Sequence, residues 1–180
     1  MNLPNKLTMF RVVLIPFFVV FMLIPVIGDA TKWIALTIFV VASITDTLDG
    51  YIARRDHLIT DFGKFMDPLA DKLLVCSAMI CLMELDRFPC IAVLLIIARE
   101  FIISGFRLIA SDNHVVIAAS YWGKIKTVCQ MITVILLIAN FGGSAVHMLE
   151  QVLIWVSVAL TVISLVDYLV KNCNVISMQK

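Results

Sequence analysis

The sequence predicts an all-α integral membrane protein with six transmembrane helices, cytoplasmic N- and C-termini and a polar cavity at the cytoplasmic side. Of its 180 residues, 62% are hydrophobic and only 15% are charged, whereas soluble domains average about 45–50% and about 25%. The mean hydropathy is +1.03. The apolar residues also gather in six stretches, each near the ~20 residues that a helix needs to cross a bilayer.

Short polar breaks separate the six predicted spans, so we expect neighbouring helices to run antiparallel. The spans are residues 10–27, 31–53, 64–84, 88–110, 117–141 and 148–171. The breaks are residues 28–29, 54–61, 84–87, 111–114 and 142–144. No internal repeat or low-complexity segment is visible in the sequence, and we expect one membrane domain over residues 1–180.

The second and third predicted spans are apolar only at their outer ends. In the second span the apolar run stops near Ile44, and the third is polar up to Lys72 and apolar from Leu73 to Met83. Polar groups facing lipid are costly, so the cytoplasmic thirds of both helices should line a wet cavity or pack on other polar helix ends.

The basic residues fix the expected orientation. With a cytoplasmic N-terminus, eleven of the 14 Lys and Arg fall on the cytoplasmic side, Lys32 and Arg87 fall outside, and Arg99 lies inside the fourth span. This asymmetry follows the positive-inside rule, and it predicts a multi-pass protein of the cell (cytoplasmic) membrane. The net charge of +1 does not discriminate between partners, and no basic run or aromatic-interleaved patch indicates nucleic acid.

Four aspartates occupy the polar ends of the second and third spans at spacings of three and four. On an α-helix these spacings place them on two faces, one about 100° wide and one on which successive members step by about 40°, together with small residues that allow a close approach. Crowded carboxylates repel one another unless cations are present. The two faces hold Asp46, Asp49, Gly50 and Ala53, and Gly63, Asp67 and Asp71.

The donor set of these faces indicates phosphate chemistry with a divalent metal. Carboxylate oxygens select hard ions such as Mg²⁺ (or Mn²⁺), which commonly bridge protein carboxylates and substrate phosphates. Two ions about 3.5–4 Å apart would hold the attacking and leaving oxygens of an in-line displacement. Pro68 fits a helix if that helix begins only a few residues earlier, so that the proline lies in its first turn.

The pattern Asp-x2-Asp-Gly-x2-Ala-Arg-x8-Gly-x3-Asp-x3-Asp, from Asp46 to Asp71, resembles the signature of the CDP-alcohol phosphatidyltransferases without a departure. The resemblance implies six transmembrane helices, often a homodimer, and transfer of a phosphatidyl group from CDP-diacylglycerol to an alcohol with release of CMP. It also implies that the four aspartates hold two metal ions and that Asp71 doubles as the catalytic base. The residues expected to bind CDP-diacylglycerol are Thr8, Arg11, Gly50, Ala53, Arg54, Thr60 and Gly63. For Thr8 and Arg11, an amphipathic interfacial anchor is the alternative.

Further stretches resemble the branch of this family that uses sn-glycerol 3-phosphate and makes phosphatidylglycerol phosphate. They are residues 2–11, 67–72, 99–107 and 123–127. A basic cluster suits an anionic acceptor, because Arg binds phosphate with two parallel hydrogen bonds. The expected glycerol-phosphate-binding residues are Arg99, Arg107, Lys124 and Lys126, with snorkelling to the headgroups as the alternative. Glu100 is expected outside the site, as a partner for Lys or Arg.

Other functions remain as alternatives. One alternative is the same chemistry with inositol phosphate, serine or phosphatidylglycerol as acceptor, although a neutral or lipidic acceptor would make the basic cluster hard to explain. An intramembrane prenyltransferase also uses aspartate-bound Mg²⁺, but it would need more spans than this length provides. A cation transporter commonly holds its ion at the midplane between repeats, and the sequence shows neither a repeat nor carboxylates at that depth.

Overall fold

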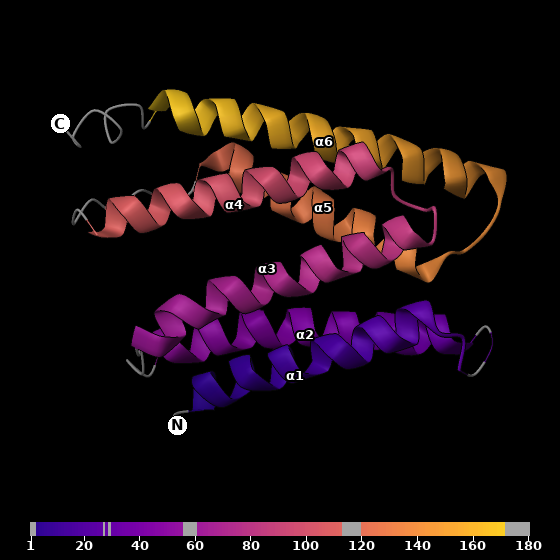
Figure 1. The fold of residues 1–180 in the computed structure, drawn as a ribbon, viewed down its shortest axis with the longest axis horizontal. Helices are drawn as coiled ribbons and strands as arrows, with labels where there is room; N and C mark the ends of the chain where they lie inside the picture. Colours follow the sequence, from indigo (N-terminus) through magenta and orange to yellow (C-terminus); the bar gives the residue numbers. More distant parts are fainter. Residues whose placement is uncertain (1–2, 27, 29, 56–60, 113–119, 172–180) are drawn as a thin grey trace. The chain divides into compact units, whose positions relative to one another are not determined.

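The computed structural model describes residues 3–26, 28, 30–55, 61–112 and 120–171, and within these ranges the regular structure is entirely α-helical. The six helices that the described residues form confirm the six predicted helical segments (Figure 1). They are α1 (Leu3–Leu23), α2 (Ala30–Arg55), α3 (Asp61–Glu84), α4 (Cys90–Asp112), α5 (Tyr121–Ala139) and α6 (Ser144–Lys171).

Four helices begin earlier than predicted, and the earlier starts of α1 and α3 affect residues of the predicted site. Helix α1 starts at Leu3 rather than at residue 10, so Thr8 and Arg11 belong to the same continuous helix as the apolar segment. Helix α3 starts at Asp61, which places Pro68 in the helix interior and not in its first turn. Proline has no backbone N–H, so the carbonyl of Lys64 receives no helical hydrogen bond from this position.

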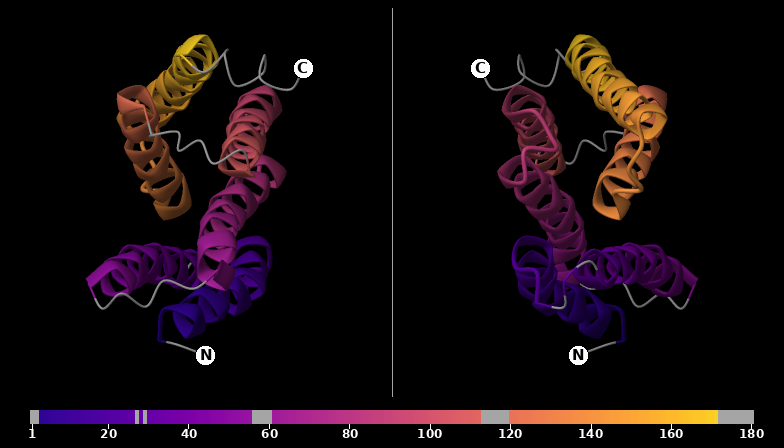
Figure 2. Two further views of the ribbon diagram at one scale, coloured as in Figure 1. Left: turned by 90° about the vertical axis from the view of Figure 1, so that its left-hand side faces the viewer. Right: turned by 90° about the vertical axis from the view of Figure 1, so that its right-hand side faces the viewer.

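By Cα packing the chain divides into two compact units. The first unit is Met1–Arg87 with Val134–Asn140, and it contains α1, α2, α3 and the end of α5. Within it, α1 packs against both α2 and α3 (Figure 2). The rings of Phe18 and Phe39 meet at a centroid distance of 5.8 Å in its apolar core. Other buried residues of this core are Ile15, Ala35, Ala42, Leu74, Ala78, Met79 and Leu82.

Two cations hold the C-terminal end of α5 inside the first unit. The guanidinium of Arg87 donates a short hydrogen bond to the carbonyl of Leu137. The ammonium of Lys32 donates to the carbonyl of Asn140 at 3.4 Å, and Asn140 itself adopts a left-handed backbone with φ of 47°. The last carbonyls of a helix have no partner within it, so these two side chains satisfy groups that would otherwise be exposed in an apolar setting.

The second unit is Phe88–Thr133 with Phe141–Lys180, in which α4 packs against α6. The buried side of α6 is largely polar, and its exposed side is apolar. The buried residues are Glu150, Ile154, Ser157, Val158, Thr161, Ser164 and Tyr168. The exposed large apolar residues include Val152, Trp155, Val156, Val162, Ile163, Val166 and Val170. This is the reverse of a helix on a soluble protein, and it is the arrangement expected of a helix in lipid.

Three of the described helices contain segments long and apolar enough to cross a membrane: Lys6–Leu23, Tyr121–Ala139 and Ser144–Lys171. A shorter apolar stretch covers Ala30–Thr45 in α2. Helix α4 carries Arg99, Glu100 and Arg107 within its length, which lowers its apolar character. The protein is therefore an all-helical, multi-pass membrane protein, while the six spans and the orientation of the termini stay predictions.

Candidate active site

The four aspartates lie on two helices of the first unit. Asp46 and Asp49 belong to α2, and Asp67 and Asp71 belong to α3, so the helical spacing on which the prediction depended is confirmed. The side chains of the first three lie outside what the structure describes. The side chain of Asp71 is described and is half-buried. Because α1 packs on both helices, the aspartate motif and Arg11 come from one packed group of helices.

The donor set of these four residues fits a divalent metal. All four offer carboxylate oxygens, the ligand type that Mg²⁺ and Mn²⁺ prefer. They are carried on α2 and α3, two helices that contact each other. Four carboxylates on neighbouring helices would repel one another without a cation between them, so the chemistry of the motif is compatible with the expected metal site.

Thr8 and Arg11 are completely buried in the first unit, each with 0% of its surface exposed. The Nε of Arg11 donates a hydrogen bond to the carbonyl of Ala42 at 3.2 Å. Ala42 lies one helical turn before Asp46 on α2, so the guanidinium group of Arg11 sits one turn from the aspartate motif. An amphipathic surface anchor would expose its polar side chains, and the burial of both residues contradicts that alternative.

The other predicted CDP-diacylglycerol residues lie near the ends of two helices. Gly50, Ala53 and Arg54 belong to the C-terminal part of α2, and Gly63 belongs to the first turn of α3. The structure describes only the backbone at these four positions. Thr60 lies outside the described residues.

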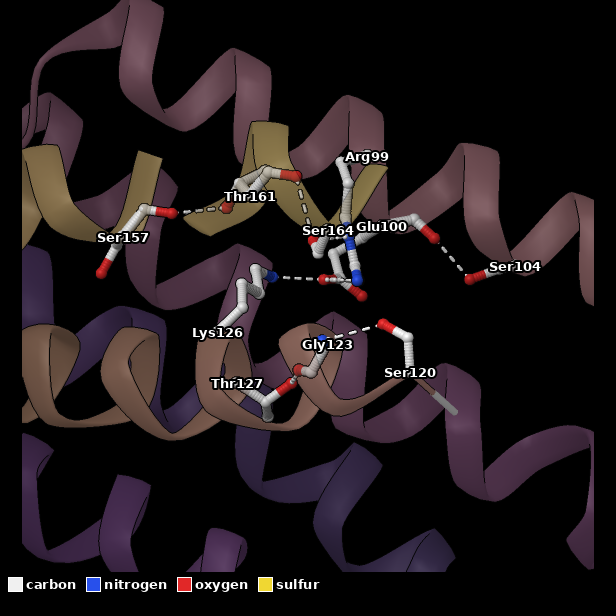
Figure 3. Close-up of polar contacts among 10 residues, drawn as sticks. All are labelled: Arg99, Glu100, Ser104, Ser120, Gly123, Lys126, Thr127, Ser157, Thr161 and Ser164. Atoms are coloured by element: carbon white, nitrogen blue, oxygen red, sulfur yellow. Dashed lines mark hydrogen bonds and ion pairs between the residues drawn. The ribbon is translucent and has the colours of Figure 1, made fainter. Parts of the chain in front are cut away.

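Two of the four predicted acceptor-binding residues meet in the second unit. The ammonium of Lys126, on α5, contacts Oε1 of Glu100 in a short ion pair. Nη1 of Arg99 lies 3.0 Å from the same oxygen. Figure 3 shows both cations directed at this one carboxylate. Lys126 is 1% exposed and Arg99 is 8% exposed, so snorkelling to the headgroups is wrong for both side chains.

A chain of hydroxyl groups supports Arg99 from α6. Nε of Arg99 donates to Oγ of Ser164 at 3.1 Å, and the Ser164 hydroxyl donates to the carbonyl of Thr161 at 3.0 Å. The Thr161 hydroxyl in turn donates to the carbonyl of Ser157 at 2.7 Å. These bonds, visible in Figure 3, restrict the guanidinium to one orientation, since Arg presents its donors in a rigid planar fork.

The start of α5 is shaped to admit Arg99. Oγ of Ser120 accepts a hydrogen bond from the backbone N–H of Gly123 at 3.1 Å, which is an N-cap of α5. A Cβ added at Gly123 would lie only 3.3 Å from Nη2 of Arg99. Glycine at this position therefore leaves room for the guanidinium group beside the first turn of α5.

Arg107 and Lys124 do not join this cluster in the described contacts. Both are exposed. The guanidinium carbon of Arg107 lies 6.0 Å from the ring centroid of Tyr168 on α6, within the range of a cation–π contact. Sequence reasoning left Glu100 outside the site, and it did not identify Ser164. Glu100 follows Arg99 directly inside an apolar helix, and that adjacency was the available signal.

Comparison with known proteins places the chain in a family. It belongs to the CDP-alcohol phosphatidyltransferase family, whose model matches residues 1–163. A Bacillus subtilis (strain 168) protein named CDP-diacylglycerol–glycerol-3-phosphate 3-phosphatidyltransferase is 44% identical over 95% of both chains. Proteins of the same name are 40% identical in Rickettsia typhi, over 96% of this chain and 97% of the relative, and 37% identical in Haemophilus influenzae, over 93% and 91%.

Proposed function

We propose that this protein transfers the phosphatidyl group of CDP-diacylglycerol to sn-glycerol 3-phosphate, giving phosphatidylglycerol phosphate and CMP. One observation carries the proposal. The unbroken aspartate motif lies on α2 and α3, in a chain that aligns along nearly its whole length with relatives named for this reaction.

Asp71 is the proposed general base. Its carboxylate would take the proton of the 1-hydroxyl of glycerol 3-phosphate as that oxygen attacks the β-phosphorus of CDP-diacylglycerol. The new phosphorus–oxygen bond forms while the bond from this phosphorus to the bridging oxygen breaks, and CMP leaves with that oxygen. A carboxylate within hydrogen-bond reach of the attacking hydroxyl is suited to this transfer, and a direct displacement needs no covalent phosphatidyl-enzyme.

The proposed metal ligands are the four carboxylates of Asp46, Asp49, Asp67 and Asp71. Mg²⁺ or Mn²⁺, as two ions, would supply charge neutralisation at the diphosphate and the departing CMP. Use of divalent metal is general in this family. The four carboxylates would hold these ions, and Asp71 at one end of the motif would also take the proton of the acceptor hydroxyl.

The substrate-binding residues fall into two proposed sets. The buried Arg11, bonded to the α2 backbone, is placed to neutralise negative charge near the motif. With it, the set for CDP-diacylglycerol comprises Thr8, Gly50, Ala53, Arg54, Thr60 and Gly63. The set for the phosphate of glycerol 3-phosphate comprises Arg99, Arg107, Lys124 and Lys126. Phosphate favours such cationic donors because charge-assisted hydrogen bonds are stronger than neutral ones.

The setting of the reaction is proposed from the pattern of charge and hydropathy. All six helices span the cell membrane as one domain, 1–180, with both termini and the aspartates facing the cytoplasm, where a water-soluble acceptor is available. The asymmetry of eleven basic residues against two supports this orientation. A homodimer is proposed from the family resemblance alone.

The test is release of CMP from CDP-diacylglycerol by the purified protein in detergent with Mg²⁺. Glycerol 3-phosphate, inositol phosphate, serine and phosphatidylglycerol are supplied in parallel. We expect release with glycerol 3-phosphate alone, and loss of release when the metal is chelated. Release with another acceptor would overturn the proposed acceptor, and no release from a well-folded sample with any of them would overturn the transferase itself.

A further inference from the structure

We propose that Glu100 is a positioning residue that holds Arg99 and Lys126 in place as the binding site for the acceptor's phosphate group. This inference rests on the proposed function and adds a residue that the sequence placed outside the site. Its basis is that one carboxylate oxygen, Oε1 of Glu100, receives both cations, Arg99 from its own helix and Lys126 from α5.

Burial makes Glu100 necessary to this arrangement. The side chain of Lys126 is 1% exposed, that of Arg99 is 9% exposed and that of Glu100 is 16% exposed. Two cations this close and this far from water would repel each other, and each would bear a desolvation penalty of several kcal/mol. The carboxylate offsets both effects. The three side chains together still carry one net positive charge, which an anionic ligand would neutralise.

The geometry leaves a defined donor for that ligand. Nε of Arg99 is bonded to Ser164 and Nη1 to Glu100, so two of the three guanidinium nitrogens are fixed. In the contacts of the described residues, Nη2 makes no hydrogen bond, and it lies beside Gly123. A phosphate oxygen could accept from Nη2 without disturbing either existing bond, because each Nη carries two N–H groups.

The first experiment replaces the carboxylate with an amide of equal shape, Glu100→Gln, and measures KM for each substrate. We expect KM for glycerol 3-phosphate to rise about tenfold or more, because the amide cannot hold both buried cations in place. KM for CDP-diacylglycerol should change less than about twofold, since its proposed set is separate. Glu84→Gln, at an exposed carboxylate ending α3, is the matched control and should change neither value.

A double-mutant cycle separates positioning from a general loss of structure. If Glu100 acts through Lys126, Glu100→Gln combined with Lys126→Met should raise KM for glycerol 3-phosphate no more than about threefold beyond Lys126→Met alone. This pair also returns the cluster to the single net positive charge of the wild type, so it remains informative if Glu100→Gln alone fails to fold. Effects that simply multiply would overturn the proposal.

Two further outcomes distinguish this inference from the proposed function. A rise in KM for CDP-diacylglycerol instead of glycerol 3-phosphate would assign the cluster to binding of the diphosphate. It would overturn the proposal that the cluster binds the acceptor's phosphate. An unchanged KM for glycerol 3-phosphate in Glu100→Gln would also overturn the proposed role in acceptor binding, but it would leave the proposed transferase activity intact. If the wild-type protein fails to use glycerol 3-phosphate at all, the proposed function fails first, and the inference fails with it.

Discussion

Burial divides the basic residues of the proposed site whose side chains the structure describes into two groups. Arg11, Arg99 and Lys126 are buried, whereas Arg107 and Lys124 are exposed. A buried charge in a membrane protein is costly and usually serves a ligand, a partner or both. The exposed pair can reach the headgroup region without such a cost. The three buried cations are therefore the stronger candidates for phosphate binding.

Asp71 offers the most direct test of the proposed chemistry. We expect Asp71→Asn to lower kcat by at least about 10³-fold, because the amide can neither accept the hydroxyl proton nor hold metal as a carboxylate does. The measurement is CMP release, with the melting temperature in detergent showing that the protein is folded. Asp167→Asn is the matched control, since Asp167 pairs with Lys171 at 2.6 Å near the end of α6. Turnover by Asp71→Asn within tenfold of wild type would refute the base assignment.

Among the elements, α5 depends on cations from outside its own sequence. Arg87 and Lys32 bind its last carbonyls, and they are also the two basic residues that the charge count leaves on the outer side. Both exceptions to the positive-inside pattern therefore have a structural reason. Cations are favourable at a helix C-terminus because the aligned peptide dipoles leave negative partial charge there.

We expect Arg87→Ala to lower the free energy of unfolding by about 1–2 kcal/mol, because a half-buried cap and a charged hydrogen bond are lost together. That corresponds to a fall in melting temperature of roughly 2–8 °C for a chain of this size. Lys32→Ala should lower it by less than half as much, since its bond is exposed and 3.4 Å long. Both variants should retain CMP release at 25 °C within about twofold. An equal or larger effect of Lys32→Ala would contradict this account of the cap.

Hydropathy predicted the helices well where the apolar composition of a segment is enough to determine its structure. All six helices were expected from apolar stretches, but the start of α1 was placed at residue 10 because the preceding turns are polar. Burial of Thr8 and Arg11 against neighbouring helices stabilises those turns, and no local pattern reports such tertiary contacts. The interior position of Pro68 was missed for the same reason. Helix propensity disfavours proline inside a helix, and the start of α3 is determined by tertiary packing, which overrides propensity.

The candidate site was predictable to a similar degree. The aspartates were found because their spacing matches the helical period, and such local spacing can be read directly from the sequence. The pairing of Glu100 with a basic residue was expected, but the particular partner Lys126 was not identified, because it is 26 residues away on another helix. Pairing between helices depends on packing, and one sequence contains no record of it. Ser164 was missed for this reason too, as its bond to Arg99 spans 65 residues.

At the scale of the whole molecule, the described residues include many large apolar side chains that are exposed and several polar side chains that are buried beside the apolar core. The residues with 0% exposure include Thr8, Arg11, Ser157 and Ser164, while Phe101 and Ile91 are 61% and 68% exposed. In water such a surface would aggregate. In a bilayer the apolar surface contacts lipid, and the buried hydroxyls hold helices together by hydrogen bonds worth about 0.6–1.7 kcal/mol each. The exposed apolar surface and the buried hydroxyls are therefore explained when lipid, and not water, surrounds the helices.

The orientation of the chain can be tested with two of its own cysteines. Cys90 is exposed at the start of α4, three residues after the predicted outer break. Cys173 follows α6 in the sequence, on the side where the C-terminus is predicted. We expect a membrane-impermeant maleimide to modify Cys90 in intact cells and Cys173 only after the membrane is permeabilised, because eleven basic residues hold the opposite side in the cytoplasm. Mass spectrometry of the modified peptides assigns each site, with Cys90→Ser and Cys173→Ser as controls. Modification of Cys173 but not Cys90 in intact cells would invert the topology and place the aspartates away from a cytoplasmic acceptor.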